Sequence, residues 1–205
     1  NGESADVLMG YNSYKTSLKE FYWDLNTKEV LMGSKSAGKA ETHFASTDSD
    51  QHGFEFDAKW ASFKLKDYTI DAGGVEKVIT ADAYVYPDSM RLSVGKSGKL
   101  LPLKNALIVL DTAEERHKIT KSSVEIISRL KYKGDGFYAY KNSTDSVQKI
   151  FFNLVASNDS GVTEATANIG EKKPFFLNPG FNFNGTISLY GGRKELLFKG
   201  VVTLP

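Results

Sequence analysis

The chain has 205 residues, of which 40% are apolar and 12% aromatic, so it can bury a substantial core and is not expected to be disordered. Its 26 basic and 25 acidic residues give a net charge of +1, which excludes the strong positive field that binding to nucleic acid or to an anionic membrane usually needs. Cysteine is absent, which excludes disulfides, zinc–thiolate sites and thiol nucleophiles.

The N-terminal part contains two short apolar segments and two polar loops. Residues 14–24 have the spacing of a helix, but the density of aromatic residues favours the competing interpretation, a strand at 20–24. A second strand is expected at 28–32, followed by a loop at 33–39. Another loop, rich in turn-forming residues, covers 46–53 and is the one place where a domain boundary could lie.

From residue 54 onward almost every apolar segment has the length and alternation of a strand. Residues 90–94 alternate cleanly and run into a Gly-containing turn at 95–98, which predicts a hairpin. Turn-forming residues recur about every 8–15 positions, without the alternation of helices and strands that a parallel sheet needs. The sequence therefore predicts an all-β fold.

One strand-like phrase occurs three times. In each copy, two apolar residues two positions apart are followed by Lys plus Asp, Asn or Gly, so the period-2 alternation breaks. Such a break predicts a β-bulge or a tight corner in every copy. The separation is 38 residues from Lys66 to Lys104 and 95 from there to Lys199, whereas a regular solenoid keeps its period. A β-sandwich or jelly roll and an irregular β-solenoid both remain open. The three copies cover residues 63–70, 101–108 and 196–203.

The loop at 46–53 contains the candidate metal ligands Asp48, Asp50 and His52. Carboxylates at alternate positions are similar to the start of a calcium loop, but an EF-hand needs Glu at the twelfth position, where this chain has Lys59. A calcium site of another type and an ordinary polar turn are the two interpretations. No cofactor other than calcium is expected.

Six aromatic residues could form a flat platform for sugar rings, as in carbohydrate-binding modules. Two pairs are spaced so that both rings lie on one face of a strand. The alternative, and the commoner fate of such rings, is that they cover the core or form cross-strand pairs. The six are Trp23, Trp60, Tyr84, Tyr86, Tyr138 and Tyr140.

Evidence for catalysis is sparse. Residues 109–113 are similar to the active-site stretch of aspartic proteases, but Ala113 replaces the Gly and no second copy supplies the partner carboxylate, so Asp111 is expected to end a strand. The paired carboxylates of glycosidases need no local spacing, so a β-rich glycosidase-like enzyme stays open.

Several stretches resemble β-rich segments of large secreted or envelope proteins of Gram-negative bacteria, in the manner of the OstA-like β-jelly-roll domains of lipopolysaccharide transport. The resemblance implies an extracytoplasmic structural or binding role and carries over no catalytic residue. The stretches are ADAYVYP at 81–87, LKNA at 103–106, SRLKY at 128–132, FLNPGFNFNG at 176–185 and LFKG at 197–200.

These observations predict one β domain over residues 1–205, forming part of a larger exported protein. Its expected role is that of a non-catalytic structural or interaction module that binds other subunits or domains of the same assembly through surfaces and strand edges. A carbohydrate-binding module, stabilised by calcium, is the alternative, with glycans as partners. No nucleic-acid partner is expected. No apolar run approaches the ~20 residues that span a bilayer, and no signal peptide is visible.

Overall fold

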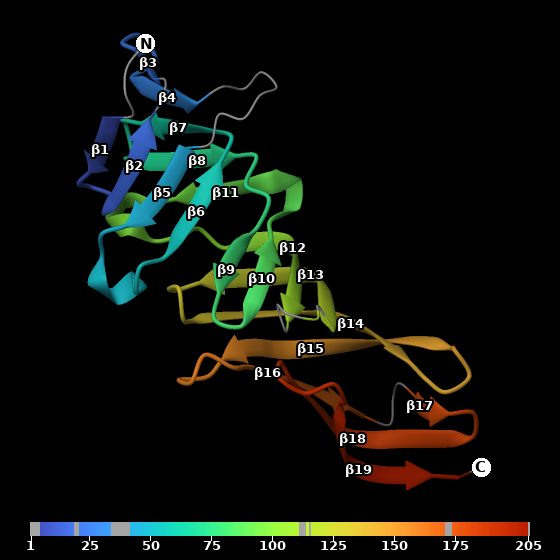
Figure 1. The fold of residues 1–205 in the computed structure, drawn as a ribbon. Coiled ribbons are helices and arrows are strands. Elements are labelled where there is room, and N and C mark those ends of the chain that lie inside the picture. The colour runs from blue at the N-terminus through green and yellow to red at the C-terminus, as the bar shows by residue number, and fades with distance from the viewer. Residues whose placement is uncertain are drawn as a thin grey trace.

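The computed structural model of the chain consists almost entirely of antiparallel β-strands (Figure 1). It describes residues 5–18, 21–33, 42–110, 114, 116–170 and 174–204. Of the described residues 64% are in strands, and their helical elements are three short 3₁₀ turns at Ser49–Gln51, Asp88–Met90 and Lys96–Gly98. The predicted all-β class is confirmed.

Two small sheets pack against each other at the N-terminal end. The first has the order β1-β2-β5-β6 and the second the order β11-β8-β7-β4-β3. Apolar residues of both sheets belong to one buried core cluster, which includes Phe44 and Phe56 of the first sheet and Met32 and Ile70 of the second. The strands of the first sheet are β1 (Ala5–Met9), β2 (Tyr14–Leu18), β5 (Thr42–Ser46) and β6 (Glu55–Ala58); those of the second are β3 (Phe21–Asp24), β4 (Glu29–Gly33), β7 (Trp60–Lys64), β8 (Thr69–Gly73) and β11 (Arg91–Val94).

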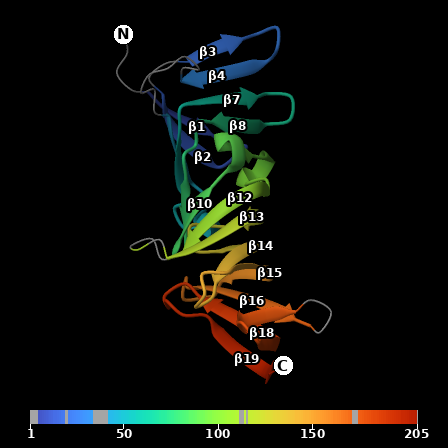
Figure 2. The same ribbon diagram turned by 90° about the vertical axis from the view of Figure 1, so that its right-hand side faces the viewer.

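The third sheet has ten strands and makes up the rest of the molecule (Figures 1 and 2). Its order is β17-β18-β16-β15-β14-β13-β12-β10-β9, with β19 on the other side of β18. The edge strand β19 thus lies at the opposite end of an elongated molecule from β3. The strands are β9 (Val78–Thr80), β10 (Ala83–Tyr86), β12 (Leu103–Leu110), β13 (His117–Ile126), β14 (Tyr132–Lys141), β15 (Val147–Ser157), β16 (Thr163–Ile169), β17 (Phe175–Asn178), β18 (Phe181–Tyr190) and β19 (Leu197–Thr203).

The third sheet curves so that its β9–β10 turn comes close to β16, and Asp82 connects the two by hydrogen bonds. Asp82 lies in the β9–β10 turn, yet it accepts a hydrogen bond from the backbone N–H of Thr163 on β16 at 3.0 Å and another from the Thr163 hydroxyl. The hydroxyl of Tyr132 lies 2.7 Å from the same Thr163 oxygen. Burial raises the pKa of Tyr132, so its hydroxyl stays protonated and serves as a donor.

The loop at 46–53 connects the hairpin of β5 and β6. Its Gln51 is buried and contacts three separate segments. The side chain accepts from the Tyr14 hydroxyl of β2 at 2.9 Å and donates to the backbone oxygen of Gly98, in the Lys96–Gly98 turn, at 2.6 Å, while its backbone oxygen accepts from the N–H of Arg129, in the β13–β14 connection, at 3.0 Å. The turn-forming composition of the loop therefore corresponds to a hairpin connection whose Gln51 holds β2 and two distant turns together.

The strand predicted at 20–24 is confirmed over its described residues, because β3 covers Phe21–Asp24, and the helix considered for 14–24 is replaced at its start by β2. Of the three repeated phrases, the first contains a tight corner, since residues 65–68 form the β7–β8 turn with Tyr68 at φ 56°. The second contains a bulge, since the β12–β13 register shifts next to Asn105, which has φ 56°. Both predictions are confirmed.

The prediction of a kink in the third phrase is wrong. β19 pairs with β18 without a register shift, and Gly200 lies directly opposite Gly185. A Cβ on Gly200 would lie 2.1 Å from the backbone oxygen of Asn184. The glycine is therefore needed for close approach of two backbones and not for a turn.

An ion pair on the second sheet gives a pH prediction. Asp71 accepts from the Lys64 ammonium at 2.6 Å and from the Ser93 hydroxyl at 2.7 Å. Partial burial works against ionisation, but these hydrogen bonds outweigh it and hold the pKa of Asp71 below its ordinary value. A lowered pKa in the folded state stabilises the fold above the unfolded pKa of about 3.9 and loses this effect as the pH falls through the folded value.

We therefore expect Asp71→Asn to make the free energy of unfolding depend less steeply on pH below about 4. Urea unfolding of both proteins between about pH 2 and pH 6 measures this. An unchanged acid dependence would contradict the assignment.

Candidate functional site

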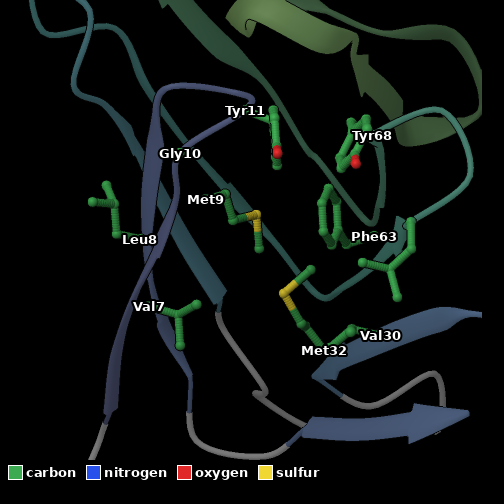
Figure 3. Close-up of a pocket in the computed structure, with 10 residues that line it drawn as sticks. Val7, Leu8, Met9, Gly10, Tyr11, Val30, Met32, Phe63 and Tyr68 are labelled. Carbon is green, nitrogen blue, oxygen red and sulfur yellow. The ribbon is translucent and has the colours of Figure 1, made fainter. Parts of the chain in front are cut away.

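An apolar groove of about 560 Å³ opens between the first and second sheets, where β1 faces β4 and β7 (Figure 3). The groove is deep, because Met9 is only 7% exposed and Met32 only 1%. In Figure 3 both methionines and Phe63 point toward one another across it, while Leu8 points to the other side of β1. The side chains that define the groove are those of Val7, Met9, Val30, Met32, Phe63 and Leu65.

Hydrogen bonds fix the two sheets to each other at one end of the groove. The side-chain amide of Asn12, which is fully buried in the β1–β2 turn, donates to the backbone oxygens of Tyr68 at 2.6 Å and Gly95 at 2.8 Å. The rings of Tyr11 and Tyr68 lie 4.1 Å apart at this end (Figure 3). A fixed end holds the walls in place, so the groove exists without a ligand.

The groove continues onto an uncovered part of the second sheet. Among the described strands, the first sheet ends at β1, whereas the second continues past β4 to its edge strand β3. Phe21 and Trp23 of β3 are the cross-strand partners of Met32 and Val30, so they share the face that lines the groove. Their exposures are 64% and 54%.

The described residues that line the groove carry no charged side chain. The methionines add adaptability, because an unbranched thioether side chain fits differently shaped apolar partners. The chemistry that this site offers is the binding of an apolar group.

Most of the groove has no local signal in the sequence. Its walls come from β1 and from β4, which are not neighbours in any sheet, and no periodicity connects Val7 and Met9 with Val30 and Met32. Trp23 was identified from the sequence, but as part of a sugar platform.

The structure distributes the six platform candidates over two sheets. Trp23 lies on the groove face of the second sheet, whereas the Trp60 ring covers Gly73, where an added Cβ would lie 2.3 Å from it. Tyr84 and the half-buried Tyr86 lie on β10, and the Lys77 ammonium sits 3.9 Å from the centre of the Tyr84 ring.

Tyr138 and Tyr140 share one face of β14, as their spacing predicts, and this face packs on the core. The Tyr138 ring contacts Phe152, with centroids 6.0 Å apart, and the Tyr140 ring contacts Phe175 at 5.2 Å. Burial raises the pKa of both phenols.

The metal candidates lie in the β5–β6 connection. The Asp48 carboxylate accepts from the backbone N–H of Asp50 at 2.9 Å, and His52 Nδ1 lies 2.9 Å from the Asp50 backbone oxygen. Across the part of the chain that the structure describes, no cluster of three or more His, Cys, Asp or Glu is arranged to hold a metal ion. Asp111 lies outside the described residues.

A second surface, also missed from the sequence, occupies the outer face of the third sheet. Phe137 and Phe151 lie there beside Asn153, Asn168 and Asn184. The signal for it was available in the alternation along β14, since inward Tyr138 and Tyr140 place Phe137 outward.

The chain matches no known family model, and no curated protein or solved structure is significantly similar to it. None of the described segments is a helix long and apolar enough to cross a membrane.

Proposed function

We propose that the chain is a non-catalytic interaction module that receives an extended segment of a protein partner alongside β1. The added strand pairs with the free edge of β1, and its alternate apolar side chains enter the groove. In this mode of recognition the backbone hydrogen bonds provide affinity, and the pockets for alternate side chains provide specificity.

One observation carries this proposal: the first sheet stops at β1 while the apolar face of the second continues to β3. The added strand would place apolar side chains at this groove, and the exposed Phe21 and Trp23, on the same face of the second sheet, offer further apolar surface beside it. Burial of such aromatic side chains is a large favourable contribution to association.

The other free edge, β19, is a weaker candidate for partner binding. β19 at the far end also exposes apolar residues, with Val201 at 67% and Val202 at 45%. The apolar groove described above adjoins β1 and is not lined by β19. We therefore assign partner binding to β1.

The wider setting is part of the same proposal. The resemblance of the strand sequences to envelope proteins supports an extracytoplasmic location, and the partner would then be another subunit or domain of a cell-envelope or surface assembly.

The test is selection of peptides from a random displayed library on the whole chain, followed by affinity measurement with Val7→Lys and Val201→Lys. We expect the selected peptides to alternate apolar and polar residues. We expect Val7→Lys to weaken them by at least ~tenfold, because it places an ammonium in the apolar groove. Val201→Lys, on an edge without that groove, is the matched control.

Hydrogen exchange supplies the second readout. Binding should protect the amides of β1. Equal affinity of both variants, or protection that appears at β19 and not at β1, would refute the proposal.

A further inference from the structure

The outer face of the third sheet carries a broad groove of about 1,190 Å³, separate from the apolar groove beside β1. Its lining comes from β14, β15, β16, β17 and β18, with Phe137 and Phe151 on the face away from the core and the buried Phe175 where the groove meets the core. The alternation along β15 shows this, since Ile150 and Phe152 are fully buried while Phe151 is 45% exposed.

Two aromatic rings form an apolar surface in this groove. Phe137 and Phe151 are direct cross-strand partners, with ring centroids 4.9 Å apart and planes inclined by 48°. A cross-strand aromatic pair can serve the sheet alone. Here, however, Phe137 also remains 36% exposed, so both rings offer surface to a ligand.

Three asparagines from three strands surround the rings. The side chains of Asn153 and Asn184 make no hydrogen bond to any described residue, and both line the groove. Asn168 accepts from the Thr186 hydroxyl at 3.1 Å, which leaves its amide N–H groups unused among the described residues. A carboxamide has N–H donors and an oxygen acceptor, so the site can donate hydrogen bonds to the hydroxyl groups of a ligand and accept hydrogen bonds from them.

One wall of the groove is rigid. Gln148 donates to the backbone oxygen of Phe176 at 2.5 Å and accepts from its N–H at 3.0 Å, so this side chain ties β15 to β17 as a strand residue would. Lys149 is the single charged residue among the described lining residues.

From this geometry we infer that the groove binds an oligosaccharide. A pyranose ring has a flat face of C–H groups, which suits Phe151 and Phe137, and a rim of hydroxyls, which suits the three asparagines. A groove above the about 300–1,000 Å³ of small-molecule pockets has room for more than one sugar ring.

Two other ligand classes fit the surface less well. β15 pairs with β14 along its length and with β16 over Leu154–Ser157. Beside the groove, the Gln148 side chain already holds the backbone of Phe176 in β17, so a peptide strand would have to displace that contact. Nucleic acid needs several cations along its backbone, and Lys149 stands alone among the described lining residues.

The experiment is a glycan array with the whole chain, followed by calorimetric titration with the strongest array glycan. Phe151→Ala should weaken binding by about tenfold or more, and Asn153→Ala combined with Asn184→Ala should do the same through lost hydrogen bonds. Phe181→Ala is the matched control, because Phe181 is 44% exposed on the same sheet and does not line the groove.

Circular dichroism and thermal unfolding establish that each variant is folded before titration. Retained affinity in Phe181→Ala with loss in the two groove variants supports the inference. It is overturned if no array glycan binds the parent chain, or if Phe151→Ala and Phe181→Ala bind equally well.

Discussion

Replacing Asp82 by alanine should lower the free energy of unfolding by about 3 kcal/mol. The carboxylate accepts both the backbone N–H and the hydroxyl of Thr163, which is fully buried, and the Tyr132 hydroxyl depends on that same Thr163 oxygen. Removing the acceptor leaves buried donors without a partner, and each such group costs about 1–3 kcal/mol. Urea unfolding followed by circular dichroism measures the loss.

Two controls make this prediction specific. Asp82→Asn keeps one oxygen acceptor and should cost less than Asp82→Ala. Asp88→Ala removes an exposed carboxylate from a nearby turn and should change stability by no more than about 0.5 kcal/mol. If Asp82→Ala and Asp88→Ala were equally mild, Asp82 would not fasten the third sheet.

Replacing Gly185 by alanine should cost about 2–4 kcal/mol and should loosen β19 selectively. Gly185 has φ 151°, a region that side chains rarely adopt, and a Cβ there would lie 2.4 Å from the backbone oxygen of Lys199 and 2.6 Å from the Cα of Gly200. The two strands would have to separate to admit it.

Hydrogen exchange measures the local effect, with faster exchange expected in β19 than in β14 or β15. Gly192→Ala is the control, because its Cβ would meet nothing within 4 Å and its backbone φ lies outside the range that favours glycine. Unchanged protection of β19 in Gly185→Ala would show that the strands tolerate the methyl group.

The strands could be predicted because their signal is local. Alternation and turn residues indicated the all-β class, and the break at Asn105 indicated the bulge in β12. The kink expected at Gly200 was wrong because the reason for this glycine lies on β18, where Gly185 faces it. Local sequence cannot distinguish a glycine needed for a turn from one needed for close approach.

The sites were harder to predict because strand packing creates them. Period-2 spacing correctly placed Tyr138 and Tyr140 on one face, but the packing of the third sheet decided that this face is inward. The groove beside β1 depends on where the first sheet ends relative to the second. The pairing of β1 with β2 and of β3 with β4 determines these two edges. A single sequence contains no direct record of such pairings.

The strands from β14 to β19 run across the long axis of the molecule, and β3 and β19 lie at its opposite ends (Figures 1 and 2). Interstrand hydrogen bonds in antiparallel sheets are perpendicular to the strands. Tension between the two ends would therefore open these bonds in succession, like a zipper, instead of shearing many at once. We expect the molecule to lengthen strand by strand at low force and to behave as an extensible spacer between whatever it tethers.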